Sequence, residues 1–309
     1  MNQATHVARP LDALNRVLAS VDSVRNGQAV YALLATFAAA GLLLALAESA
    51  LAHSAAVWGV IWGGASLTTL FYGSNAAGLL LFDEARGLQT RGVGVALRDA
   101  LATAHRLLLV LICVVALGLG LLALLAAALW TTRVPWVGPA LLGLLLPAAV
   151  VVVGVAILSC AAVIAPLAAP AIWSGHGVLA TLALLLRHTR QRLVYVALLM
   201  TAVSGLAALV GALITFSIMT GGRVVSALAV VAAGIELPPQ MLMAGMFGHG
   251  LRSLGTAGAP AVQSPYGQAV LAGGGVVFML ALVLPALVYL RGTCSVYLTL
   301  EQRDETVLE

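Results

Sequence analysis

The chain has 309 residues, of which 62% are hydrophobic and 8% are charged. A soluble globular domain carries about 25% charged residues, so this composition excludes a water-soluble fold and indicates a membrane protein. The 15 basic residues are all arginine and outnumber the 11 acidic ones. Because these charges flank apolar segments, the positive excess indicates membrane topology rather than nucleic-acid binding.

Six stretches are long and apolar enough to cross a bilayer, for which a helix needs about 20 residues. None contains a formal charge, because an Arg or Asp at the middle of a membrane helix costs about 2.5 to 3.5 kcal/mol. The sequence lacks short strands of alternating polarity, so we expect an all-α, polytopic bundle of transmembrane helices with interfacial amphipathic helices. The six stretches are 29–47, 56–82, 107–130, 141–165, 194–218 and 268–290.

The arginines are divided unequally between the two sides that six spans define. With both termini on one side, twelve arginines share that side and three, Arg133, Arg223 and Arg252, lie opposite. The positive-inside rule therefore predicts cytoplasmic termini. The preference for Ala, Leu, Gly and Arg, with no Lys, indicates a bacterial inner-membrane protein. The twelve are Arg9, Arg16, Arg25, Arg86, Arg91, Arg98, Arg106, Arg187, Arg190, Arg192, Arg291 and Arg303.

A short basic segment precedes each pair of spans and has the apolar periodicity of a helix lying on the cytoplasmic surface. This pattern divides the single membrane domain, 1–309, into parts at 1–82, 83–165 and 166–309. Arginines in the second and third segments are candidate contacts for anionic lipid, at about 1 kcal/mol each. The alternative is that they only anchor and orient the spans. The candidates are Arg91, Arg98, Arg106, Arg187, Arg190 and Arg192.

The segment 220–267, between the last two spans, is apolar but interrupted. Pro238 and Pro239 remove two backbone donors and disfavour helix before them. We expect a broken helical hairpin that re-enters the membrane or lies on its outer face, with a seventh span over 224–250 as the alternative. Glu236 is the candidate intramembrane carboxylate, unless the hairpin lies at the surface and the carboxylate is solvated.

A polar stripe runs along the second span. Thr68, Tyr72 and Asn75 are spaced to share one helix face, close to the Gly59-x-x-x-Gly63 pair. These side chains would either line a path for a substrate or an ion, or form hydrogen bonds between helices at about 0.6 kcal/mol each.

The sequence contains no motif for a cofactor or a metal ion. Its six histidines are scattered without metal-ligand spacing, and a phosphate loop is absent. Ser204 and His249 could be paired as in an intramembrane protease, but a serine that bonds a carbonyl of its own helix is the simpler interpretation.

Three short stretches resemble a broad set of multi-pass bacterial proteins. Among named domains, these stretches resemble the membrane domain found on some glycerophosphodiester phosphodiesterases. The resemblance implies a multi-pass membrane domain, but it carries no phosphodiesterase activity, because that chemistry belongs to a separate barrel of about 250 residues. The stretches are Phe82-Asp83-Glu84-Ala85-Arg86-Gly87, the segment from Ala165-Pro166 to Pro170-Ala171-Ile172, and Tyr297 with Glu301 and Arg303.

The function that these features favour is a non-enzymatic scaffold or accessory protein, which contacts anionic lipid, a membrane protein partner or a second copy of itself. The spans lack the clustered charge of pumps and channels, and no extramembrane segment is long enough for a catalytic domain. The alternative is a transporter of small molecules or lipids, with the stripe and Glu236 as its path. An intramembrane hydrolase is the least favoured function.

Overall fold

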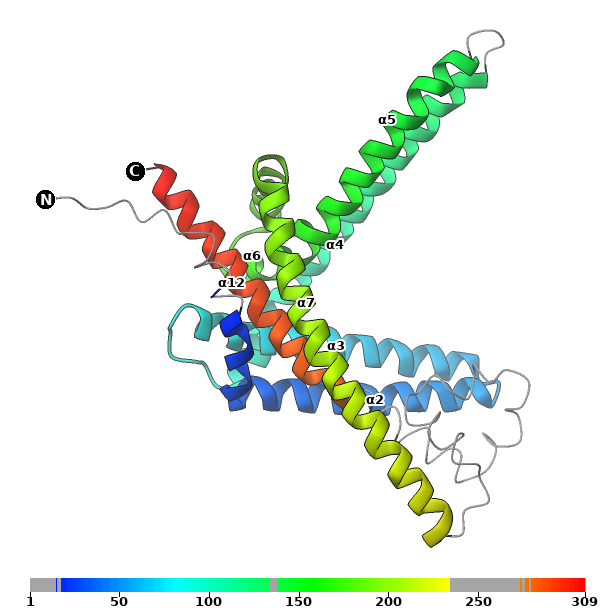
Figure 1. Ribbon diagram of the computed structural model, residues 1–309, viewed down its shortest axis with the longest axis vertical. Coiled ribbons are helices and arrows are strands. Elements are labelled where there is room, and N and C mark those ends of the chain that lie inside the picture. Colours follow the sequence, from blue (N-terminus) through cyan, green and yellow to red (C-terminus); the bar gives the residue numbers. More distant parts are fainter. Residues whose placement is uncertain are drawn as a thin grey trace, which may run out of the picture. The chain divides into compact units, whose positions relative to one another are not determined.

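The computed structural model describes residue 15 and residues 18–133, 138–233, 273, 276–277 and 279–308. Every regular element in these ranges is a helix, as expected. The helices are η1 (Ala19–Arg25), α2 (Gly27–Ala52), α3 (Ala56–Ala85), α4 (Val93–Trp130), η2 (Thr131–Arg133), α5 (Gly138–Ser159), the π-helical segment η3 (Cys160–Ile164), α6 (Ala165–Trp173), α7 (Val178–Ala233) and α12 (Val283–Leu308) (Figure 1).

Five helical segments in the described part of the chain are long and apolar enough to cross a membrane. They are Gly27–Ala52, Val93–Arg133, Gly138–Trp173, Val178–Val225 and Met279–Arg303. The chain is therefore a multi-pass, helical membrane protein. α3, which contains the second predicted span, has the length but is not one of the five. Its glycine, serine, threonine and asparagine residues lower its mean hydropathy, so the crossing by this helix stays a prediction.

Two predicted surface helices are joined to the spans that follow them. α4 runs without a break through both the basic segment and the third span, because no glycine or proline falls between 95 and 117. α7 is also one element, but the backbone leaves helical geometry at Arg192, where φ is −139° and ψ is 21°. This kink lies where the predicted surface segment meets the fifth span.

α7 also extends beyond the predicted end of the fifth span, to Ala233. The first part of the predicted hairpin 220–267 is therefore helical. The remainder of that segment, including Glu236, lies outside the described residues.

The chain forms two compact units, and α4, α7 and α12 each pass from one unit to the other. Unit 1 comprises residues 1–17, 101–203 and 292–309, and unit 2 comprises 18–100 and 204–291. The three-part division at 82 and 165 stays a prediction.

Unit 2 is built around the antiparallel hairpin of α2 and α3, which lie side by side (Figure 1). The hydroxyl of Ser66 donates to the carbonyl oxygen of Ala40 across the two helices, at 2.9 Å. At Gly73 the helices come so close that a Cβ atom would lie 2.7 Å from Cβ of Thr36. Small residues thus allow these helices to approach closely.

Unit 1 has its core where α6, the first part of α7 and the last part of α12 contribute buried apolar side chains. These include Leu167 of α6, Val196 and Val203 of α7, and Leu300 of α12, all with no exposed surface. Gly292 of α12 meets Val203, since a Cβ atom at this glycine would lie 2.5 Å from Cγ1 of Val203.

Candidate functional site

Charged side chains gather in unit 2 where α3 ends and α4 begins. α3 ends at Ala85 and is followed by Gly87, whose φ of +69° is the left-handed conformation that glycine adopts without strain. The N–H of Gly87 donates to Glu84 O and that of Leu88 to Asp83 O, both at 3.0 Å. This is the Schellman turn, which satisfies the last carbonyls of a helix. The turn reverses the chain and returns Arg91 to Asp83.

Arg91 binds two carboxylates. Its Nε and Nη2 atoms donate to the two oxygens of Asp83 at 2.7 and 2.8 Å, and its Nη1 donates to Asp99 Oδ2 at 2.6 Å. Asp83 is buried, whereas 40% of the Asp99 side chain is exposed. The hydrogen bond to Asp83 raises the pKa of Arg91 above its ordinary value, against the opposing effect of burial. The arginine is therefore held charged between α3 and α4.

Glu84, next to Asp83, links α3 to two more parts of unit 2, the start of α2 and α12. Its Oε2 accepts a hydrogen bond from Nδ2 of Asn26, the N-cap of α2, at 2.6 Å. Its Oε1 lies 3.9 Å from Nε of Arg291 in α12. Nη1 of Arg291 also approaches the carbonyl oxygen of Leu81 at 3.3 Å. We call Asp83, Glu84, Arg91, Asp99 and Arg291 the charged cluster.

The six arginines that were predicted to contact lipid differ in their burial and in their partners within the protein. Arg91 belongs to the charged cluster, and Arg192 is half-buried at the kink of α7. Arg187 is exposed on α7. Arg98, Arg106 and Arg190 are also exposed, and within the described ranges no carboxylate pairs with them.

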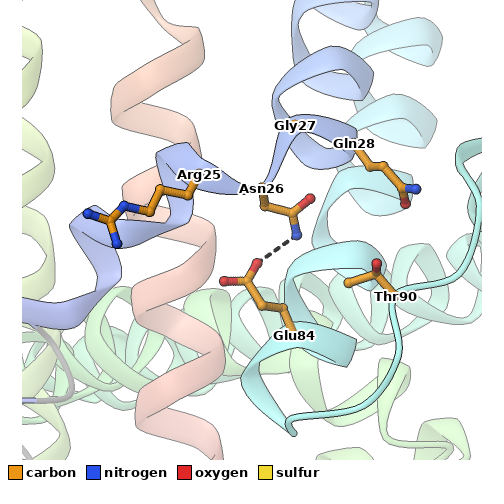
Figure 2. Close-up of a pocket in the computed structure, with 6 residues that line it drawn as sticks. All are labelled: Arg25, Asn26, Gly27, Gln28, Glu84 and Thr90. Atoms are coloured by element: carbon orange, nitrogen blue, oxygen red, sulfur yellow. Dashed lines mark hydrogen bonds between the residues drawn. The ribbon is translucent and has the colours of Figure 1, made fainter.

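The pocket that we describe in unit 2 lies beside the charged cluster. Its volume is about 520 Å³, and its lining residues are Arg25, Asn26, Gly27, Gln28, Glu84 and Thr90. Figure 2 shows Asn26 and Glu84 pointing toward each other, with Arg25 on one side and Gln28 and Thr90 on the other. Apart from Gly27, every lining residue has a polar side chain, which is unusual in a chain of this composition.

A second polar group lies in unit 1, where α6 turns into α7. The hydroxyl of Ser174 donates to Ala171 O at 2.8 Å and lies 2.7 Å from His176 Nδ1 and 2.9 Å from the hydroxyl of Tyr297. Gly175, with a φ of +98°, makes this turn. The bonds connect the turn to α12 and leave the serine hydroxyl engaged on all sides.

His188 is the one buried histidine among the described residues, and it precedes the predicted fifth span. Burial, with the nearby charges of Arg187 and Arg192, lowers the pKa of His188 from 6.5 to about 4. Between pH 6.5 and pH 4 His188 is therefore protonated in the unfolded chain but not in the folded chain. In this range each unit by which the pH falls lowers the free energy of unfolding by about 1.4 kcal/mol.

We expect the free energy of unfolding to be about 2 kcal/mol lower at pH 5 than at pH 7 because of His188. Unfolding temperatures in detergent across this range would measure the effect. His188→Gln removes the titrating group, so it should flatten the profile, whereas His53→Gln, at an exposed histidine, should leave it unchanged. A profile as steep in His188→Gln as in the original protein would contradict this prediction.

The predicted polar stripe is not a single continuous surface. Thr68 is exposed, Tyr72 is half-buried and Asn75 is buried. Thr68 Oγ1 donates to Gly64 O, and Asn75 Nδ2 donates to Phe71 O, both at 2.8 Å and both within α3. Carbonyls of the same helix thus accept a hydrogen bond from each of these two side chains, as is common for polar side chains in membrane helices.

The charged cluster and the pocket were not predicted as sites. The sequence does place Asp83 and Glu84 at the end of an apolar stretch, ahead of a glycine and an arginine. That order is a usable signal, because a Schellman turn brings residues after the glycine back to the last helical turn. The part of the chain that the structure describes holds no group of three metal-binding side chains. No family model, curated protein or solved structure matches the chain.

Proposed function

We propose that this chain is a non-catalytic membrane protein whose arginine-bearing helices bind anionic lipid headgroups, as a scaffold or accessory factor of a bacterial inner membrane. The observation that carries the proposal is the exposure of Arg98, Arg106 and Arg190. Each precedes an apolar span, and none has a carboxylate partner among the described residues. Such an arginine gains about 1 kcal/mol near an anionic surface.

The contacts inside the protein support the proposal that some arginines stabilise the fold and others bind an external partner. Arg91 and Arg291 are engaged with carboxylates inside unit 2, and Arg303 lies over the ring of Tyr195 in unit 1, at 4.4 Å. These arginines stabilise helix ends. Within the described residues Arg98, Arg106 and Arg190 make no such contact, so lipid or another protein is the partner that their charge suits.

The contacts also agree with the predicted topology. Asn26, Glu84, Arg91 and Arg291 come from three segments that the charge distribution assigns to the cytoplasmic side, and unit 2 brings them together. Side chains that meet in this way are expected to share one side of the membrane. This supports the proposal that Arg98, the exposed arginine of unit 2, faces the cytoplasmic leaflet.

Removal of the three exposed arginines tests the proposal. We expect the triple variant Arg98→Gln, Arg106→Gln and Arg190→Gln to bind phosphatidylglycerol or cardiolipin at least roughly tenfold more weakly, since about 1 kcal/mol per arginine is lost. Lipids retained by the protein in mild detergent, measured by native mass spectrometry, provide the readout. High salt should weaken binding to the original protein as well.

The matched control removes the same charge from the opposite side: Arg133→Gln, Arg223→Gln and Arg252→Gln. This control should keep most of the affinity for anionic lipid. Equal losses in the two triple variants would show that net charge alone is measured, and the proposed lipid contacts would then be wrong.

The transporter alternative gains no support from the described residues. Thr68 and Asn75 bond within their own helix, and no charged group accompanies them on α3 at membrane depth. The hydrolase alternative needs an activated hydroxyl, and its partner His249 lies outside the described residues.

A further inference from the structure

The polar pocket of unit 2 contains one cation and one anion. Arg25 is exposed, and within the described part of the chain no carboxylate pairs with it. Glu84 donates nothing and accepts one short hydrogen bond from Asn26, while its Oε1 is beyond hydrogen-bond distance from Arg291. A carboxylate has about four acceptor positions, so Glu84 retains capacity for a further donor.

The pocket therefore suits a ligand that carries both charges. An anionic group can face Arg25 and the N–H groups of Gly27 and Gln28, which as the first residues of α2 have no acceptor within the helix. A cation with N–H donors can face Glu84. The volume of about 520 Å³ is within the usual range of about 300 to 1,000 Å³ for small-ligand sites.

Exposed apolar side chains precede Arg25 in the chain, together with the exposed Asp22. Leu18, which precedes η1, and Val21 and Val24 of η1 expose 54%, 41% and 45% of their surface. Exposed aliphatic side chains close to a polar pocket suit an amphiphilic ligand. Its acyl chains can cover the aliphatic side chains while its headgroup enters the pocket. η1 also directly precedes the membrane-crossing helix α2.

We propose that this pocket binds the headgroup of a phospholipid with a primary ammonium, the phosphoethanolamine class. Glu84 accepts hydrogen bonds from the ammonium, and Arg25 faces the phosphate. The inference rests on the proposed contact with lipid, but it concerns a different lipid class and different residues. It predicts selectivity for ethanolamine over choline, since a quaternary ammonium has no N–H to donate.

The experiment compares short-chain lipids added to the purified full chain in detergent, with binding followed by thermal stabilisation. Dioctanoyl phosphatidylethanolamine is expected to bind about tenfold more tightly than dioctanoyl phosphatidylcholine, the factor that one charge-assisted hydrogen bond supplies. Glu84→Gln should abolish this preference. Arg25→Gln should weaken both lipids and leave their ratio unchanged.

Two controls separate this inference from the proposed function. Arg223→Gln should behave as the original protein, and the triple variant at Arg98, Arg106 and Arg190 should retain the preference for ethanolamine. Equal binding of the two dioctanoyl lipids would overturn the pocket assignment without bearing on the exposed arginines. Soluble glycerophosphoethanolamine should bind at least roughly tenfold more weakly than the lipid. Equal affinity would overturn the assignment to a phospholipid.

Discussion

Gly73→Ala is expected to destabilise the protein by about 1 to 3 kcal/mol, although it adds a single methyl group. Any Cβ atom at position 73 would overlap Oγ1 and Cγ2 of Thr36 and would lie 2.7 Å from its Cβ. Rotation of Thr36 does not relieve the overlap, because Cβ lies on the rotation axis. The threonine is also fixed by its hydrogen bond to Ala32 O, at 2.7 Å. The two helices must therefore separate.

Gly64→Ala is the matched control, because a Cβ atom at Gly64 has open space around it. Both changes gain the same helix propensity, about 1 kcal/mol, so the difference between their unfolding temperatures in detergent isolates the contact with α2. A compensating change should restore stability: Thr36→Gly combined with Gly73→Ala moves the bulk from one helix to the other. Equal unfolding temperatures for the two single variants would show that α2 and α3 do not pack as described.

The spacing of small residues on α3 is evident in the sequence, but the sequence did not show that these residues face α2. Gly59, Ser66 and Gly73 recur every seven residues, and each approaches α2. The prediction used the neighbouring Gly59-x-x-x-Gly63 pair and interpreted the Thr68 stripe either as a path for a substrate or as a source of hydrogen bonds between helices. Helical periodicity gives the members of each face, but which face packs is decided by the partner helix.

Apolar length and charge segregation were sufficient to predict the helical membrane fold. The kink at Arg192 falls where the predicted third basic segment meets its span. The uninterrupted α4 was not predicted, because amphipathic and fully apolar helices differ in their surroundings and not in their backbone. The point at which a helix passes from the membrane surface into the lipid is therefore not by itself the end of that helix.

The charged cluster depends on tertiary geometry that residue spacing does not contain. Asp83 and Arg91 are eight residues apart, a separation that brings side chains together only if the chain turns at Gly87. Arg291 reaches Glu84 from a distant part of the sequence. The prediction therefore treated Arg91 as a lipid contact, whereas the structure gives it two carboxylate partners.

Arg91→Gln is expected to cost about 2 to 3 kcal/mol of unfolding free energy. The change leaves the carboxylate of Asp83 without its arginine, with only 7% of the side chain exposed, and an uncompensated buried charge costs about 3 to 5 kcal/mol. We expect about 2 to 3 kcal/mol rather than the full cost of a buried charge, because the side chain of Arg91 is 33% exposed and solvent weakens the ion pair. Asp99→Asn should cost less than about 1 kcal/mol. The Asp99 side chain is largely exposed to water, and exposed ion pairs contribute little to stability.

A double-mutant cycle separates the ion pair from other effects of removing Arg91. Asp83→Asn combined with Arg91→Gln should be more stable than Arg91→Gln alone, because no buried charge is then left uncompensated. Arg98→Gln, the same substitution at an exposed arginine, should change stability by less than about 0.5 kcal/mol. If Arg91→Gln were as mild as Arg98→Gln, the cluster would be a surface feature. The end of α3 would then need another explanation for its buried aspartate.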